Sequence, residues 1–224
     1  MEVDVISMSW TYERHTTETD TNKSEFQTLI EDIVNYNKAI LFGSLPDMGA
    51  NVALHRFVPV GMPGVIKISS ATLDGAVSVE NIHTKSDFLL PGEGYRSSTG
   101  ETLRGSSFAT AYAAGLAALV LYTMKAYTLL RDDVNADDAD KALAIASKGE
   151  GMQSIFRVLA QRGAEEKGES GLFVRPSLTF GDAFRTSLEG SKQDLKTVVA
   201  DMVPTSVKRA NYDLATVSLA NKLV

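Results

Sequence analysis

The chain has 224 residues, of which 44% are hydrophobic and 22% charged; this length can bury a sizeable core, and the composition excludes a disordered polypeptide. A formal net charge of −6 gives no electrostatic reason to expect a nucleic acid or an anionic membrane surface as a partner. The absence of cysteine excludes thiol catalysis, thiolate metal sites and disulfides.

The first residues alternate apolar runs with a helical pattern. Val3–Trp10 is rich in β-forming residues and predicts a buried parallel strand, whereas Thr11–Lys23 is polar and predicts a loop. Ser24 and Gln27 have the spacing of a capping box at the start of a helix. The apolar residues of that helix fall at helical spacing: Phe26, Leu29, Ile30, Ile33 and Val34.

Three more strands are expected further along the chain. Ala39–Phe42 predicts a strand that ends at the turn-forming cluster Gly43–Gly49. Val65–Ala71 and Asp87–Leu90 predict two others, and Pro91 stops the second of these. Short strands separated by a helix indicate a parallel sheet with right-handed crossovers, so we expect an α/β fold.

The longest apolar segment predicts a helix over about Ser107–Leu130, apolar nearly all round and therefore the most buried of the fold. The run from Gly105 to Met124 carries no charge and is long enough to cross a bilayer. Its many small residues and thin basic flanks instead favour a helix packed inside a soluble protein. We therefore expect no membrane partner.

The C-terminal part has a different character. An acidic connection over 132–140 leads into expected helices at Asp140–Ser147 and Met152–Gln161, and Thr186–Leu223 is expected to be helical in pieces. The predicted organisation is a sheet domain over 1–130, its helical completion over 131–165, and a helical tail of unknown role over 166–224.

A potential nucleophile stands directly before the long apolar helix, in the segment Gly105–Ala111, whose sequence is Gly-Ser-Ser-Phe-Ala-Thr-Ala. A serine in the first turn of a buried helix lies near unpaired N–H groups and the positive end of the helix dipole, which suits an attacking oxygen. Considered by itself, the same pattern is more often a helix cap.

Taken in order, five segments resemble the C-terminal half of the subtilisin-like serine proteases, the subtilases (peptidase S8/S53 type). One of the five is Gly105–Leu119, in which Gly105–Ala111 resembles the family's nucleophile signature and Ala113–Leu119 resembles the helix that follows it. The other similar segments are Val3–Trp10, Ala39–Gly49, Val65–Ile68 and Asp87–Gly92. The closest resemblance is to divergent subtilase-like domains of fungal multidomain proteins. The fold implied is a partial subtilisin-like parallel-sheet core with a mainly helical C-terminal extension.

The resemblance implies a serine endopeptidase that needs no cofactor and no metal and acts on a peptide or protein substrate. Ser107 is then the nucleophile and Asp47 takes the oxyanion-hole position, where the family usually has asparagine. The implied walls of the substrate groove, narrower than usual, are Ser9, Trp10 and Thr11 on one side and Ser44, Leu45 and Pro46 on the other.

The family's catalytic aspartate and histidine precede the strand at Val3, so we expect this chain alone to be inactive and an N-terminal peptidase half to be a possible partner. His15, His55 and His83 lack the family's His-Gly context, and none is expected to be the base. The N-terminus has no signal-peptide pattern, which favours the cytoplasm. Two alternatives remain open: a non-catalytic domain that binds a peptide or partner in the former substrate groove, and a truncated gene with no folded product.

Overall fold

The computed structural model describes residues 3–14, 24–49, 52–81, 85–130, 136–161 and 171–175. Their contacts divide them into two compact units. The first contains the described residues of Met1–Ala117 and Glu166–Phe173, and the second those of Ala118–Glu165 and Val174–Val224. Each unit is described by itself.

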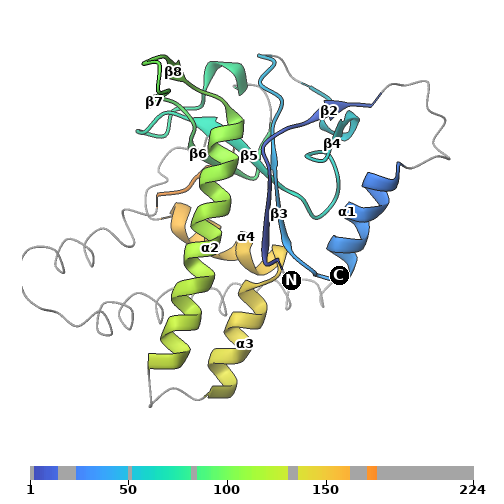
Figure 1. The fold of residues 1–224 in the computed structure, drawn as a ribbon, viewed down its shortest axis with the longest axis vertical. Coiled ribbons are helices and arrows are strands. Elements are labelled where there is room, and N and C mark those ends of the chain that lie inside the picture. Colours follow the sequence, from blue (N-terminus) through green and yellow to red (C-terminus); the bar gives the residue numbers. More distant parts are fainter. Residues whose placement is uncertain are drawn as a thin grey trace, which may run out of the picture. The chain divides into compact units, whose positions relative to one another are not determined.

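The first unit is built on a five-stranded, all-parallel sheet with the strand order β1-β3-β5-β6-β9 (Figure 1). The strands are β1 (Val5–Met8), β3 (Ile40–Ser44), β5 (Ile66–Ala71), β6 (Phe88–Pro91) and β9 (Leu172–Phe173). The three central strands are almost wholly buried, as is typical of parallel strands covered on both faces, although β5 contains Lys67, Ser69 and Ser70. The predicted α/β class, with its parallel sheet, is confirmed.

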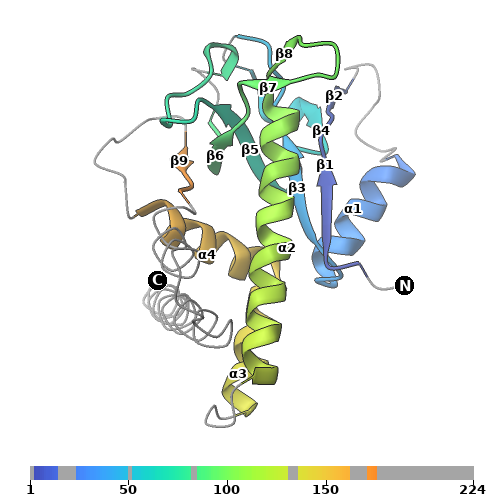
Figure 2. The same cartoon turned by 60° about the vertical axis from the view of Figure 1, so that its left-hand side comes forward.

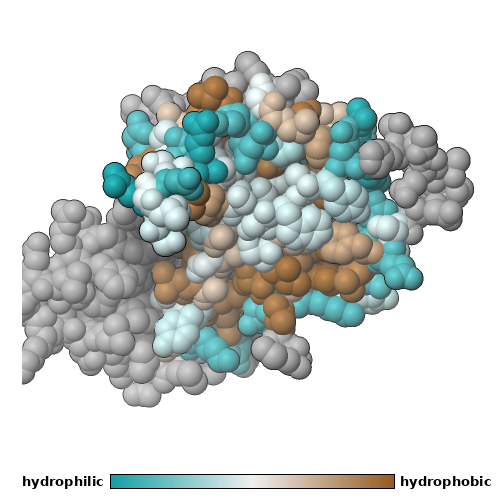
Figure 3. Space-filling view, turned by 45° about the horizontal axis from the view of Figure 1, so that its top comes forward, coloured by the Kyte–Doolittle hydropathy of each residue, from teal (hydrophilic) through white to brown (hydrophobic). Residues whose placement is uncertain are grey.

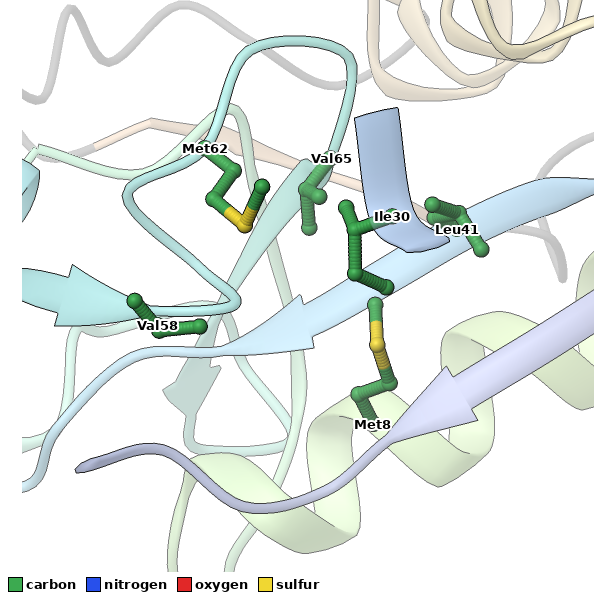
Figure 4. Packing of buried hydrophobic residues seen from close by; sticks show 6 residues of the cluster. All are labelled: Met8, Ile30, Leu41, Val58, Met62 and Val65. Atoms are coloured by element: carbon green, nitrogen blue, oxygen red, sulfur yellow. The ribbon is translucent and has the colours of Figure 1, made fainter. Parts of the chain in front are cut away.

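Helix α1 (Glu25–Asn35) joins β1 to β3 and begins at the predicted capping box. The Ser24 hydroxyl accepts the backbone N–H of Gln27, and the Gln27 side chain accepts the N–H of Ser24. The buried side of the helix packs on the sheet, and Figure 4 shows Ile30 lying between Met8 of β1 and Leu41 of β3. The rest of this core cluster is Val58, Met62 and Val65.

Short strands and 3₁₀ helices lie near the ends of the sheet strands. The strands β2 (Tyr12–Glu13) and β4 (Phe57–Val58) form one antiparallel pair, and β7 (Tyr95–Arg96) and β8 (Thr102–Leu103) form another. The 3₁₀ helices are η1 (Leu54–Arg56) and η2 (Val79–Asn81). Figures 1 and 2 show the β7–β8 pair beside the first turn of α2.

Helix α2 (Ser106–Leu130) starts in the first unit and continues into the second. The prediction that it is the most buried helix is wrong for one of its faces, since Tyr112, Leu119 and Tyr122 are 43%, 49% and 72% exposed. An apolar helix needs only one packed face, and tyrosine tolerates solvent through its hydroxyl. The domain boundary expected at residue 130 stays a prediction.

Among the described residues, the segment Ser106–Ala126 of α2 is the one helical stretch long and apolar enough to cross a membrane. The core helix of a soluble protein meets the same criterion, and 44% of the 18-residue apolar window within this segment is buried inside the protein. The expectation that the chain has no membrane partner therefore stays a prediction.

The second unit holds the end of α2 with α3 (Ala136–Ala146) and α4 (Gly149–Gln161). Both helices begin earlier than the sequence predicted. Gly151 lets them approach closely, because a Cβ there would lie 2.0 Å from the Ile145 carbonyl oxygen. Residues 132–135 of the expected acidic connection and the helices expected over Thr186–Leu223 lie outside the described residues, whereas residues 136–140 of that connection belong to α3.

Two other glycines, Gly61 and Gly115, provide a matched test of the backbone packing in the structure. A Cβ on Gly61 would lie 1.9 Å from the Leu54 carbonyl oxygen, so Gly61→Ala must displace backbone and should destabilise the protein by about 3 kcal/mol. A Cβ on Gly115, in the middle of α2, would have no neighbour within 4 Å, so Gly115→Ala should stabilise the protein by about 0.5–1 kcal/mol. Urea unfolding of the full chain measures both. Equal effects of the two substitutions, or no cooperative transition in the parent chain, would contradict the packing described.

Candidate functional site

The candidate site lies where three neighbouring strands end. Asp47 follows β3, Ser70 lies near the end of β5, and Gly92 follows β6. The carboxyl ends of parallel strands lie on one edge of a sheet, where α/β proteins commonly bind their ligands. The first turn of α2 reaches the same edge, because its Ser106 hydrogen-bonds to both Asp47 and Ser70.

Two glycines, Gly92 and Gly105, allow the close backbone contacts of the turn that precedes α2. The Gly92 amide donates to the Ala71 carbonyl, and the Gly105 amide donates to the Gly92 carbonyl, both at 2.9 Å. A Cβ on Gly92 would lie 2.3 Å from Ser70 Oγ, so no larger residue fits in this arrangement. Gly105 has a φ of 139°, a region that side chains disfavour. The residue before the two serines must therefore be glycine for the turn to form.

A carboxylate holds the start of α2. The Ser106 amide donates to Asp47 Oδ2 at 2.9 Å and lies 3.2 Å from Oδ1, and the Ser106 hydroxyl donates to Oδ1 at 2.7 Å. The Asn81 amide Nδ2 donates to the same Oδ1 at 2.6 Å. The carboxylate thus satisfies a helix-terminal N–H that has no partner inside the helix, and its negative charge lies at the positive end of the helix dipole.

The buried Ser106 hydroxyl is the centre of this network. Besides donating to Asp47, it accepts the backbone N–H of Ser70 at 3.2 Å and the Asn81 amide at 3.0 Å. The network continues from Ser70, whose hydroxyl accepts from Ser78 at 2.7 Å. Asn81 is 1% exposed, and its Oδ1 is one of three buried side-chain atoms without a partner among the described residues. Its amide orientation is fixed, because the flipped amide would place Oδ1 against the Asp47 carboxylate.

Ser107 differs from Ser106 in every one of these respects. Ser106 is fully buried, whereas Ser107 is partly exposed. The hydroxyl and the amide of Ser107 make no hydrogen bond to any described residue, while the amides of Phe108 and Ala109 both donate to the Gly105 carbonyl. Ser107 therefore combines an accessible hydroxyl with an unoccupied N–H at a helix start, which is an arrangement that suits a nucleophile and its oxyanion.

An aromatic pair borders the same turn. The rings of Tyr95 and Phe108 stack with centroids 5.2 Å apart, and the Tyr95 hydroxyl donates to the Pro91 carbonyl at 3.2 Å. Burial raises the pKa of Tyr95, and the nearby Tyr112 raises it further. A tyrosine with a raised pKa keeps its proton through neutral pH and stabilises the fold until the pH rises above its ordinary value of about 10. Tyr95 thus supports the turn as a neutral donor.

One expected groove wall follows β1. Ser9 and Thr11 are partly buried, and the Thr11 hydroxyl donates to the Val58 carbonyl at 3.1 Å. Trp10 is 49% exposed and contacts Tyr12 and Phe26, with ring centroids 6.3 Å and 5.4 Å away. Figure 3 shows one face of the molecule, on which hydrophilic, intermediate and hydrophobic residues are mixed. An exposed aromatic pair offers contact area for apolar side chains of a peptide.

The other expected wall is largely buried. Ser44 is 4% exposed, and Pro46 is buried as well. Leu45 is 1% exposed and packs in a hydrophobic cluster with Phe57 and Val60. A contribution of Leu45 to a groove would therefore come from its backbone. The assignment of these residues to a substrate groove stays a prediction.

No base for Ser107 is found among the residues that the structure describes. His55 is exposed in η1 and makes no hydrogen bond to Ser107, and His15 and His83 lie outside the described residues. The described residues also hold no cluster of three potential metal-ligating side chains. The expected absence of a cofactor stays a prediction.

Sequence reasoning missed Ser70 and Asn81. Ser70 could have been noticed as a polar residue at the carboxyl end of a buried strand. Asn81 offered no signal, because it lies in a short 3₁₀ turn within a segment of mixed polarity.

The two adjacent serines should respond differently to alanine. Ser106→Ala leaves the Ser70 N–H without an acceptor and removes one partner each from Asp47 and Asn81, so it should destabilise the protein by about 2 kcal/mol. Ser107→Ala, the matched control, removes no hydrogen bond and should change stability by less than about 0.5 kcal/mol. Denaturant unfolding of both variants tests this, and a Ser107→Ala effect as large as that of Ser106→Ala would refute the division of roles.

Comparison with known proteins bears on the fold. No protein-family profile and no curated protein sequence matches the chain. Among solved structures, the chain is similar to a lanthipeptide protease, with 18% identity and a TM-score of 0.54, over 77% of this chain and 59% of that one. The prenylagaramide maturation protease PagA matches at 16% identity and a TM-score of 0.43, over 75% of this chain and 58% of that one. A mutant of the protease domain of PatA matches at 16% identity and a TM-score of 0.45, over 78% and 57%.

Only the first of these likenesses has a TM-score above 0.5, and at 18% identity it shows the fold alone. The chain spans less than two thirds of the length of each of the three proteases. The resemblance to a fungal branch of the family stays a prediction. Its strand order and its likeness to the lanthipeptide protease show that the chain has an α/β fold with a five-stranded parallel sheet that matches the core of subtilisin-like proteases.

Proposed function

We propose that this chain carries the nucleophile half of a subtilisin-like serine endopeptidase site, with Ser107 as the nucleophile. The observation that carries the proposal is the contrast between the two serines at the start of α2. Ser106 is buried and bonded to three neighbours, whereas Ser107 presents an unengaged hydroxyl and amide at the carboxyl edge of the sheet. The likeness in fold to a lanthipeptide protease supports a peptide substrate.

The chemistry would be acyl transfer. Ser107 Oγ attacks the carbonyl carbon of a peptide bond, its proton passes to a base, and the amine leaves with a proton while the acyl group stays on Ser107 until water removes it. The Ser107 amide is placed to donate to the oxyanion. No base bonded to Ser107 exists among the described residues, so the described part of the chain should lack family-level activity. The mechanism requires a histidine and a carboxylate from outside the described residues.

A second function is favoured by one specific feature, the Asp47 carboxylate. It places a negative charge in the first turn of α2, where an enzyme of this kind needs hydrogen-bond donors. The same arrangement suits a non-catalytic domain that binds a peptide along the carboxyl edge of the sheet. In that function, Ser107 would be an ordinary surface serine.

Site-resolved labelling tests the first function. The full chain is incubated with a fluorophosphonate probe, and mass spectrometry measures the labelling rate at each serine. We expect slow labelling overall, with Ser107 modified faster than other exposed serines because its amide can stabilise the developing oxyanion. Ser107→Ala should abolish this excess. Labelling spread evenly over the exposed serines would contradict a nucleophilic Ser107, and labelling as fast as in active serine hydrolases would contradict the absence of a base.

Peptide binding tests the second function. If the groove binds peptides without catalysis, a fluorescent peptide mixture digested from casein should bind the chain with the same Kd before and after Ser107→Ala. Trp10→Ala should weaken binding by about tenfold, since it removes half-exposed aromatic contact area. Tyr36→Ala, at an aromatic residue 69% exposed at the end of α1, is the control for a general loss of surface aromatics. Binding insensitive to Trp10→Ala would contradict a groove along this wall.

A further inference from the structure

The position of Asp47 leads to an inference about its role that is opposite to the one expected from sequence. An asparagine would donate to a developing oxyanion at this position, so a carboxylate there reads as a defect. In the structure both carboxylate oxygens are instead engaged as acceptors by the start of α2 and by Asn81. The side chain therefore points at the helix terminus as an anchor.

The loop that carries Asp47 is itself held in place. The Leu45 amide donates to the Ile68 carbonyl at 3.0 Å, which continues the sheet bonding past the end of β3. The Gly49 amide donates to the Glu80 carbonyl at 2.7 Å, one residue before Asn81. Two hydrogen bonds, one through the Gly49 backbone and one through the Asp47 side chain, thus fasten this loop to η2. The loop that carries the carboxylate is therefore held by bonds that do not involve Ser106.

The anchor also lies next to the nucleophile. A Cβ on Gly105 would lie 2.9 Å from Asp47 Oδ2 and 3.6 Å from Ser107 Oγ, so the two oxygens flank the same point of the turn. A shift of the Ser106 backbone would carry the adjacent Ser107 amide and hydroxyl with it. A displacement of about 1 Å at a reacting group can cost about a hundredfold in rate.

We propose that Asp47 is a positioning residue: its carboxylate, braced by Asn81, fixes the Ser106 backbone and thereby aims Ser107. This inference rests on the proposed role of Ser107 as the nucleophile. An asparagine at the same position lacks the negative charge that a helix start favours, and with Asn81 oriented as in the structure it cannot accept every donor that the carboxylate accepts. If its oxygen takes the place of Oδ1, its NH₂ group faces the Ser106 N–H across 2.9 Å; if its oxygen takes the place of Oδ2, its NH₂ group faces the Asn81 amide across 2.6 Å. With Asn81 oriented as in the structure, either position of the oxygen sets one donor against another.

The test compares Asp47→Asn with Glu80→Gln in the full chain. Glu80 is a nearby carboxylate that pairs with the exposed Arg104 at 2.9 Å and has no bond to Ser106, so it controls for the loss of one negative charge. We expect Asp47→Asn to slow fluorophosphonate labelling of Ser107 at least about tenfold. Glu80→Gln should change it less than about twofold. Faster labelling of Asp47→Asn than of the parent chain, as a restored oxyanion donor worth about 10²–10³ in rate would give, overturns the proposal.

A spectroscopic measurement separates this proposal from the proposed function. In ¹H–¹⁵N NMR spectra at pH 7, the Ser106 amide should show the downfield proton shift and slow hydrogen exchange of an N–H bonded to a carboxylate. Asp47→Asn should remove both features, and Glu80→Gln should leave them in place. A Ser106 amide unaffected by Asp47→Asn overturns the anchor even if Ser107 labels. A lost Ser106 signature with no preferential labelling of Ser107 supports the anchor and instead contradicts the nucleophile.

Discussion

The contact between the Asp47 carboxylate and Ser106 is the constraint on which the candidate site depends. A helix start leaves several N–H groups without partners, and here the first of them is bonded to a side chain that comes from the end of another strand. Because Asp47 follows β3 and Ser70 lies near the end of β5, the bonds of Ser106 tie α2 to two strands of the sheet at once. The position of Ser107 is then a consequence of where the sheet ends, and local helix propensity contributes little to it.

Backbone clearance is the second requirement for that arrangement. Gly92 and Gly105 allow two loops to pass within hydrogen-bonding distance of each other, and a side chain on Gly92 would collide with Ser70. The close approach brings the donors and acceptors of the buried polar network together, and among these side chains the Asn81 Oδ1 atom is left without a partner. Networks of this kind specify a single conformation when fully satisfied and are costly when a member is removed.

The sequence could predict the parallel sheet, α1 with its capping box, and the serine before α2, because apolar runs, cap residues and glycine turns are local signals. The residues themselves could not show which serine is buried, since Ser106 and Ser107 differ only in the contacts that the fold brings to them, and it was the family resemblance that singled out Ser107. The role of Asp47 was likewise hidden, because its three donors come from residues 34 and 59 positions away along the chain. The exposure of one face of α2 was missed for a similar reason: apolar composition does not show which faces a neighbour covers.

The number of donors left at the start of α2 bears directly on the choice between catalysis and binding. The Ser106 amide is bonded to Asp47, and the amides of Phe108 and Ala109 are bonded to Gly105, so the Ser107 amide is the donor of this turn that a ligand can use. A single oxyanion donor is typically worth about 10²–10³ in rate, which is far below the acceleration of a complete serine protease. A second donor and a base must therefore come from elsewhere if the site is catalytic. Without them, the same turn can still bind a peptide carbonyl, because binding one needs no proton transfer.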